Sequence, residues 1–306
     1  MTMIVAGLVV ALYLISQWAG PVLARATWPS RRPATAVVLW VSLLAAMAVV
    51  LLTLTLMILA WPPGPLHRWF EHLRSCMPGH THVGELAALA VAVVGGGWLL
   101  LAAWRGMTRV SRTVTERRRH HEMVQLIARY PDSPRDVCLI EHPFALIYCL
   151  PRRARPIVMT TGLLKQLDGA QVEAVLEHER CHLQHRHHLV LAVADAMRTA
   201  LPWSATVKHA VTELSTLVEM VADDAAVRRC GVAPVVDALH RLTPVTGPTG
   251  SLGAGDESGR RMKQRIARLE AGRGQARHPG PRAVLLLSLA TLSGVLLAAV
   301  ALHLPC

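Results

Sequence analysis

Four long apolar runs set the pattern of hydrophobic and polar positions along this chain. Each run holds about 19 to 25 residues, which is enough for an α-helix to cross the ~30 Å hydrocarbon core of a bilayer. The runs are residues 3–23, 36–60, 86–104 and 283–302. We therefore predict a mainly α-helical integral membrane protein with four transmembrane helices.

The composition also favours a membrane protein. Hydrophobic residues make up 52% of the 306 residues and charged residues only 17%, which is too apolar for an ordinary soluble domain of this length. The formal net charge of +12 raises the question of nucleic-acid binding. Most basic clusters flank the apolar runs, however, where positive-inside sorting and anionic lipid account for them. We expect the lipid bilayer as a partner and no direct contact with nucleic acid.

The arginines indicate how the four spans are oriented. The link after the first run carries three arginines and no acid, six arginines follow the third run, and three precede the fourth. Positive residues collect on the cytoplasmic side, so these three regions share that side only when the first helix starts outside. We predict a multi-pass plasma-membrane protein with both termini exterior and residues 105–281 cytoplasmic.

The six cysteines do not follow a paired metal-binding spacing. Cys76 and Cys306 both fall on the exterior side of this topology, where they form either a disulfide or two separate thiols. The other four lie on the cytoplasmic side, where we expect them to stay reduced.

Residues 105–281 are long enough for one domain with its own core. Runs of β-branched, aromatic and apolar residues predict a pair of strands at 137–150 and 157–164, joined by a basic turn at 151–156. A helix then begins at Asp168 or Gly169. We therefore predict an α+β domain inserted between the third and fourth spans.

The strongest indication of chemistry lies in that helix, where residues 178–182 read His-Glu-Arg-Cys-His. Side chains four apart project from one face, so His178 and His182 can converge on one metal ion while Glu179 points at its bound water. Zn²⁺ lowers the pKa of that water to near neutrality, and a carboxylate that takes its proton starts the attack on a peptide carbonyl. A surface helix with two solvated histidines is the alternative, but residue frequencies give only roughly 0.03 chance matches.

A catalytic zinc site needs a third protein ligand besides two histidines. Glu219 is our candidate, because it lies in a run of good helix formers four residues before Asp223. The two carboxylates share a helix face, so Glu219 can bind the metal while Asp223 accepts a hydrogen bond from a ligand histidine. Glu213 points to a different face and is the weaker candidate.

These residues resemble the BlaR/MecR-type family of membrane-embedded zinc metallopeptidases, related to HtpX-type and CAAX-prenyl membrane proteases. The resemblance covers essentially the whole chain and is most specific at residues 157–228. It includes residues 174–182, residues 186–188 and the pair Glu219 and Asp223. It implies that His178, His182 and Glu219 bind Zn²⁺. It also implies that Glu179 is the general base and that Asp223 supports a ligand histidine.

The chain departs from that family in two places. The β-lactam receptors carry an exterior penicillin-binding sensor after the last span, which this sequence lacks, so we do not expect it to sense antibiotics in that way. Position 187 is histidine where the receptors lead us to expect an acid. We interpret His185, His187 and His188 as a solvated extension of the site.

Two further segments lie before the last apolar run. Residues 244–259, rich in Pro, Gly and Ser, predict a flexible linker or a mobile flap over the cleft. Residues 260–269 form a basic amphipathic segment, which we expect to lie on the inner leaflet of the membrane.

The leading hypothesis is an integral-membrane zinc endopeptidase that cleaves a protein substrate. The substrate would add as a strand along residues 144–149 or 157–161. By resemblance it is a transcriptional repressor in a signalling pathway, and the alternative within the enzyme class is a quality-control protease acting on damaged membrane proteins. A receptor or scaffold with structural zinc, in which Glu179 is dispensable, is the rival. The oligomeric state and self-cleavage stay open.

Overall fold

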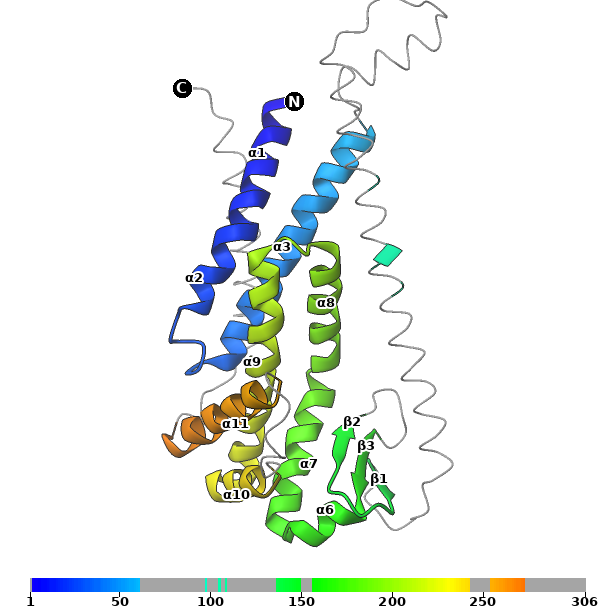
Figure 1. Ribbon diagram of the computed structural model, residues 1–306, viewed down its shortest axis with the longest axis vertical. Helices are drawn as coiled ribbons and strands as arrows, with labels where there is room; N and C mark the ends of the chain where they lie inside the picture. The colour runs from blue at the N-terminus through cyan, green and yellow to red at the C-terminus, as the bar shows by residue number, and fades with distance from the viewer. Residues whose placement is uncertain are drawn as a thin grey trace, which may run out of the picture.

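The computed structural model describes residues 2–60, 136–149, 156–242 and 254–272, together with the isolated positions 97, 104, 105 and 108. Within these residues the chain is mainly helical, with one small three-stranded sheet (Figure 1). The spans predicted at 86–104 and 283–302 lie almost wholly outside the described residues, as do Cys76 and Cys306. Those expectations stay predictions.

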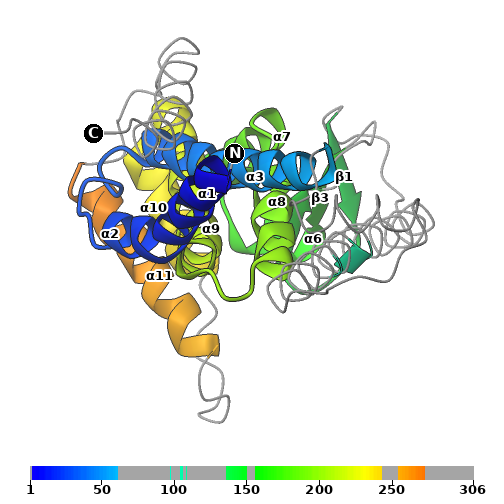
Figure 2. The ribbon, with the colours of Figure 1, turned by 90° about the horizontal axis from the view of Figure 1, so that it is seen from above.

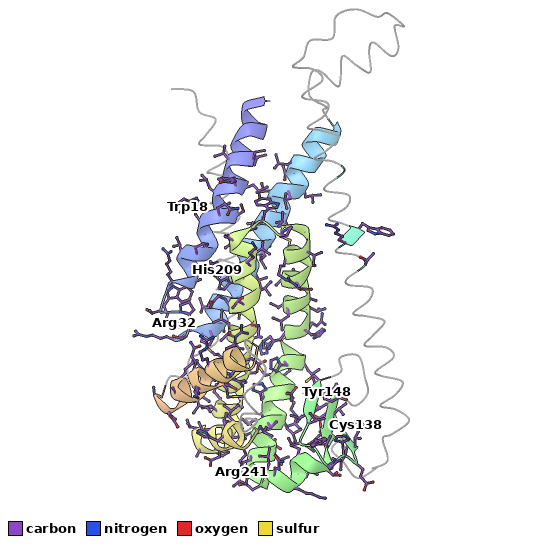
Figure 3. All side chains as sticks on the ribbon, viewed as in Figure 1. Trp18, Arg32, Cys138, Tyr148, His209 and Arg241 are labelled. Carbon is purple, nitrogen blue, oxygen red and sulfur yellow. The ribbon has the colours of Figure 1, made fainter. Side chains whose placement is uncertain are left out.

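Two apolar helices lie where the first two spans were predicted. The first is continuous and consists of α1 (Thr2–Leu14), a π-helical turn η1 (Ile15–Ala19) and α2 (Gly20–Ala24), and the second is α3 (Pro33–Ala60). Both are long and apolar enough to cross a membrane, and only 33% and 39% of their most apolar segments is buried. Trp18, which is 65% exposed, points away from the other helices (Figure 3). This exposure distinguishes both helices from the core helix of a soluble protein.

The sheet has β3 (Ile157–Thr160) at its centre. β1 (Val137–Ile140) pairs with β3 in parallel, and β2 (Ile147–Cys149) pairs with it antiparallel. The single strand predicted at 137–150 is therefore wrong. A turn containing Pro143 divides it into β1 and β2, because proline cannot donate a hydrogen bond to a strand ladder.

The strand predicted at 157–164 is also shorter than expected. The Thr160 side chain accepts a hydrogen bond from the amide of Leu163 and so caps helix α6 (Thr161–Gln166), which ends the strand. Because β3 has partners on both sides, residues 157–161 cannot offer a free edge to a peptide. β2 can, since its outer edge has no partner among the described strands.

Five longer helices follow α6 in the described part, and two of their boundaries have clear local causes. Asp168 caps α7, as predicted, in a reciprocal capping box with Gln171 (2.9 and 3.1 Å). Arg186, at φ 52°, lies in the left-handed region and separates α7 from the next helix. The helices are α7 (Gly169–Gln184), α8 (His187–Ala200), α9 (Ala205–Cys230), α10 (Val232–Leu242) and α11 (Ala254–Glu270).

The α8–α9 hairpin packs along the two apolar helices instead of forming a separate layer (Figures 1 and 2). One hydrophobic core joins Trp40 and Met47 of α3 to Leu201 and Leu214 of the hairpin. The zinc domain that we predicted at 105–281 therefore shares a core with the predicted spans.

The π-helical turn attaches the start of α9 to the first apolar helix. The Thr206 hydroxyl donates to the Ile15 carbonyl (2.6 Å) and accepts from the Gly20 amide (2.7 Å), and the Ser204 hydroxyl donates to the Ser16 carbonyl (3.1 Å). A Cβ atom on Gly20 would lie 2.3 Å from the Thr206 Cα atom. Only glycine allows the two helices to approach this closely.

Helix α11 corrects the interpretation of residues 260–269 as a segment lying on the inner leaflet. Its apolar residues Ile266 and Leu269 are buried in a cluster with α9 and α10. Arg265 and Arg268 are buried as well, each paired with an aspartate of α9. The amphipathic pattern was read correctly, but the surface that it covers is protein and not lipid.

The contact between Gly20 and Thr206 predicts a large effect of a small substitution. Gly20→Ala should lower the free energy of unfolding by about 1–3 kcal/mol, because the added methyl group meets backbone that cannot move aside. The measurement is thermal unfolding of the purified protein in detergent. Gly169→Ala, where no atom lies within 4 Å of the added Cβ, is the control. Equal unfolding midpoints for the two variants would contradict this packing.

Candidate metal centre

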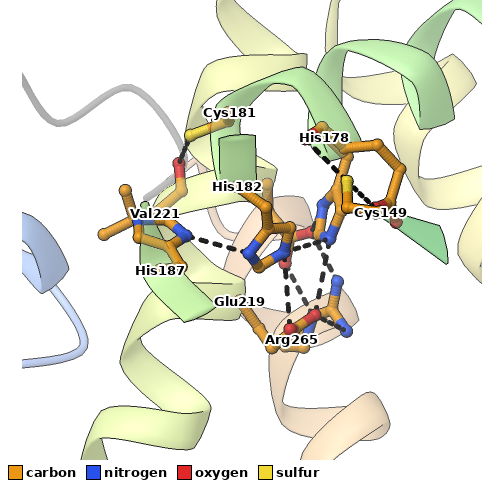
Figure 4. Close-up of polar contacts among 10 residues, drawn as sticks. Cys149, His178, Cys181, His182, His187, Glu219, Val221 and Arg265 are labelled. Atoms are coloured by element: carbon orange, nitrogen blue, oxygen red, sulfur yellow. Dashed lines mark hydrogen bonds and ion pairs between the residues drawn. The ribbon is translucent and has the colours of Figure 1, made fainter. Parts of the chain in front are cut away.

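Three predicted ligand residues converge where α7 crosses α9 (Figure 4). The Nε2 atoms of His178 and His182, one turn apart on α7, lie 3.1 Å from each other. The two carboxylate oxygens of Glu219 on α9 lie 3.4 Å from His178 Nε2 and 3.5 Å from His182 Nε2. The spacing along α7 aligns the imidazoles, and the packing of α9 on α7 supplies the carboxylate.

The spacing of these donor atoms suits a tetrahedral zinc ion. Bonds of about 2.0–2.1 Å in tetrahedral geometry separate neighbouring ligand atoms by about 3.3–3.4 Å. The 3.1 Å between the two Nε2 atoms is close to that edge length, and each Nε2 atom has a different oxygen of Glu219 at a similar distance, 3.4 Å for His178 and 3.5 Å for His182. Two histidines and one glutamate also form a ligand set found in catalytic zinc sites, which keep the fourth position open.

Asp223 lies behind the first histidine. Its Oδ1 atom is 3.1 Å from His178 Nδ1, on the side of the ring away from Glu219. The Asp223 carboxylate is also bound by Arg265 of α11 through two hydrogen bonds of 2.6 and 2.8 Å. A third nitrogen of Arg265 lies 3.1 Å from Glu219 Oε2. Arg265 therefore fixes both carboxylates that surround His178.

The charges of this cluster favour a cation. Burial raises the pKa of Glu219, but His178 and Arg265 outweigh it and lower that pKa to about 2. Burial also raises the pKa of Asp223, but Arg265 and His178 outweigh this effect and lower that pKa. At His178 burial opposes protonation, yet the two carboxylates raise its pKa to about 9. A metal cation can replace the proton that the carboxylates hold on His178.

His187 is buried and touches the second histidine of the motif. Its Nδ1 atom lies 2.9 Å from His182 Nδ1, so its interpretation as a solvated residue is wrong. Burial, then His182 and His185, lower the pKa of His187 to about 3. The neutral ring can accept the Nδ1 proton of His182, which leaves His182 Nε2 available for a metal. His185, in contrast, is exposed.

Cys181, His185 and His187 form a second group whose possible ligand atoms lie within 4.8 Å of one another. This group is less suitable for a metal for two reasons. The Nδ1 atom of His187 already contacts His182. Burial raises the pKa of Cys181 to about 11, whereas the thiolate is the form that binds metals.

Glu179 points toward the end of β2. The thiol of Cys149 donates a hydrogen bond of 2.8 Å to Glu179 Oε2. Burial, and then the charge of Glu179, raise the pKa of that thiol, so Cys149 stays protonated and keeps donating. Arg180 holds α7 beside the sheet, because it binds Asp136 next to β1 (2.8 Å) and Glu177 on its own helix (2.7 Å).

The structure thus brings His178, His182, Glu219 and Asp223 together, with Glu179 beside the sheet. Glu213 does not join them and lines a cavity along a different face of α9. Sequence analysis missed Cys149 and Arg265 at this site and misread His187. One signal for Arg265 was available: the Arg265 and Arg268 pair complements the charges of the adjacent Asp223 and Asp224.

Comparison with known proteins gives a family match for part of the chain. Residues 115–214 match the model of peptidase family M48. This third of the chain contains the His-Glu-x-x-His motif and ends just before Glu219. The match indicates a metalloprotease-type hydrolase, a class that is generally zinc-dependent. The BlaR/MecR-type assignment stays a prediction.

Two curated proteins are similar to parts of the chain. "Protease HtpX homolog" from Methanopyrus kandleri is 43% identical over 54 residues, which cover 17% of each protein. "Protease HtpX homolog 1" from Streptomyces coelicolor is 30% identical over 116 residues, covering 36% of this chain and 38% of the relative. The chain therefore spans well under half the length of these relatives. No solved structure matches the chain.

The two glutamates of α9 should differ in their effect on bound zinc. Glu219→Gln should remove most of the zinc that co-purifies with the protein, because an amide is a much weaker zinc ligand than a carboxylate. Glu213→Gln, the same change six residues earlier on the same helix, should leave the zinc content unchanged. Elemental analysis of the purified variants measures their zinc content. Equal zinc contents would exclude Glu219 as the third ligand.

Asp223 and Asp224 provide a second matched pair, since each forms a buried ion pair with an arginine of α11. Asp223→Asn should weaken zinc binding by about 10–100-fold, because it alters the group that orients His178. Asp224→Asn also disturbs a buried ion pair, but no described contact joins Asp224 to the histidines. Competition with a zinc chelator measures both dissociation constants. A similar loss of zinc affinity in the two variants would show a general effect of disturbed packing.

Proposed function

We propose that this chain is an integral-membrane zinc endopeptidase that hydrolyses peptide bonds in protein segments close to the cytoplasmic surface of the plasma membrane. The position of Glu179 carries this proposal. Its carboxylate belongs to the same helical turn as the converging ligands and lies at the end of β2, whose outer edge is free among the described strands. A metal site, a base and an edge for an extended peptide therefore meet at one place.

The edge of β2 suits an extended, apolar substrate segment. Backbone groups on the outer edge of β2 can form hydrogen bonds with an added strand. Next to this edge Phe144 is 71% exposed and Leu146 is 49% exposed. These side chains can contact apolar residues of the substrate, which are common in membrane-protein segments.

Different residues of the site have different roles in the proposed reaction. When bound, zinc polarises the scissile carbonyl and lowers the pKa of the attacking water. Glu179 takes a proton from that water and returns it to the leaving amine. The Cys149 thiol keeps the Glu179 carboxylate at the end of β2. Asp223 and Arg265 hold the His178 ring in the orientation that ligation needs.

Packing against α3 supports a substrate near the membrane. Cys181, which lies between Glu179 and His182 in the sequence, packs with Val221 and Ala222 against Ala34 and Val37. Ala34 and Val37 belong to the first turns of α3. The metal site therefore lies one layer of side chains from the end of an apolar helix.

This location favours quality control of membrane proteins over cleavage of a soluble repressor. A site at the membrane surface can reach the exposed loops and ends of neighbouring spans. The repressor substrate rests on the family resemblance alone, and the cytoplasmic placement of the site rests on the distribution of arginines. A receptor or scaffold with structural zinc does not need a base at the end of a free strand edge.

The test compares new protein N-termini in cells that express the wild type or Glu179→Gln at equal levels in the membrane. Removal of the base should reduce cleavage by about 10²–10⁴-fold while zinc stays bound. N-termini seen only with the wild type would name the substrates.

Glu173→Gln is the control, because it changes an exposed glutamate on the same helix that contacts Arg180 (3.1 Å) and is not among the grouped metal-ligand candidates. Its profile should match the wild type. If the Glu179→Gln profile also matches the wild type while its zinc content is normal, proteolysis is excluded under those conditions. The receptor reading would then replace it.

A further inference from the structure

A cavity of about 800 Å³ lies apart from the metal cluster, between the α2–α3 link, α9 and α11. Four arginines line it: Arg25 and Arg31 from the link, and Arg260 and Arg261 from α11. Glu213 is the one acidic side chain of its lining. The charge around this cavity is therefore strongly positive.

We infer that this cavity binds the phosphate group of an anionic phospholipid. Arginine suits this ligand because its planar guanidinium can donate two parallel hydrogen bonds to phosphate oxygens. Arg25 and Arg31 are exposed, and their side chains make no hydrogen bond or ion pair with any described residue. Both can turn toward a phosphate group without breaking a hydrogen bond or ion pair to a residue that the structure describes.

The walls of the cavity are held in place before a ligand arrives. Buried Arg268 pairs with Asp224 of α9 (2.6 and 2.8 Å) and donates from Nε to the carbonyl of Ser30 in the link (2.6 Å). Arg261 donates to the Ser215 hydroxyl of α9 (2.9 Å). These bonds connect all three walls, so little conformational entropy is lost when an anion binds.

The position of the cavity favours a lipid headgroup over a soluble phosphate. Arg25 follows the last residue of α2, and Arg31 lies two residues before the first residue of α3, so both lie where the two apolar helices end. Basic residues at this level meet the anionic headgroups of the cytoplasmic leaflet. Val22, which is 65% exposed on α2, lies on the apolar helix along which acyl chains would run.

The proposal does not depend on proteolysis and can be tested on the purified full-length protein in detergent. Native mass spectrometry measures the binding of phosphatidylglycerol and of zwitterionic phosphatidylcholine. The wild type should retain phosphatidylglycerol preferentially. Arg31→Gln should weaken its binding about fivefold, and Arg25→Gln with Arg31→Gln about 20- to 30-fold, because each arginine near the surface contributes comparably.

Two variants separate this site from general surface charge. Arg32→Gln removes the same charge one position further along the link (Figure 3), at a residue that does not line the cavity, and should leave binding unchanged. Glu213→Gln removes the carboxylate of the cavity and should strengthen binding. Zinc content, measured on every variant, reports that the fold is intact.

Three results would overturn the proposal. Equal losses of phosphatidylglycerol binding in Arg31→Gln and Arg32→Gln would show that the lipid is attracted by the general positive charge of the surface. Equal retention of the two lipids would show no selection for an anion. Displacement of phosphatidylglycerol by millimolar inorganic phosphate, with the same dependence on Arg31, would identify a soluble phosphate and not a lipid as the occupant.

Discussion

The buried ion pair between Arg265 and Asp223 is the contact on which the rest of this structure depends. A carboxylate that is fully buried costs several kcal/mol unless it is paired, and Arg265 supplies two hydrogen bonds to it. Asp223 in turn contacts His178, and Arg265 reaches Glu219. One pair thus connects α11, α9 and the metal-binding face of α7, and it keeps α11 against the domain instead of at the membrane.

A second constraint is the core that the α8–α9 hairpin shares with the apolar helices. The π-helical turn presents the carbonyls of Ile15 and Ser16 to Thr206 and Ser204, and Gly20 lets the backbones approach. Since α9 carries Glu219 and Asp223, these contacts also fix the position of the metal cluster along the apolar helices. The proposed lipid cavity follows from the same arrangement, because its walls are the link between those helices, α9 and α11 (Figures 1 and 2).

The sheet shows how a correct local pattern can lead to an incorrect arrangement. The apolar runs at 137–150 and 157–164 do contain all three strands, but β-propensity does not reveal that Pro143 divides the first run or that Thr160 caps a helix. Strand order depends on pairing between segments, and it places β3 in the centre. For this reason only β2 offers an edge beside Glu179, where sequence analysis left two candidate edges open.

The sequence by itself determined what lies within single helices: two long apolar helices, the capped start of α7, and the pairs His178 with His182 and Glu219 with Asp223. Helical spacing alone decides which side chains share a face. Tertiary structure decided which faces meet. It brought His187 onto His182 across the break at Arg186, and it carried Arg265 from the predicted membrane surface to a buried aspartate. Those contacts follow from packing and from the cost of unpaired buried charge, which no spacing along the chain records.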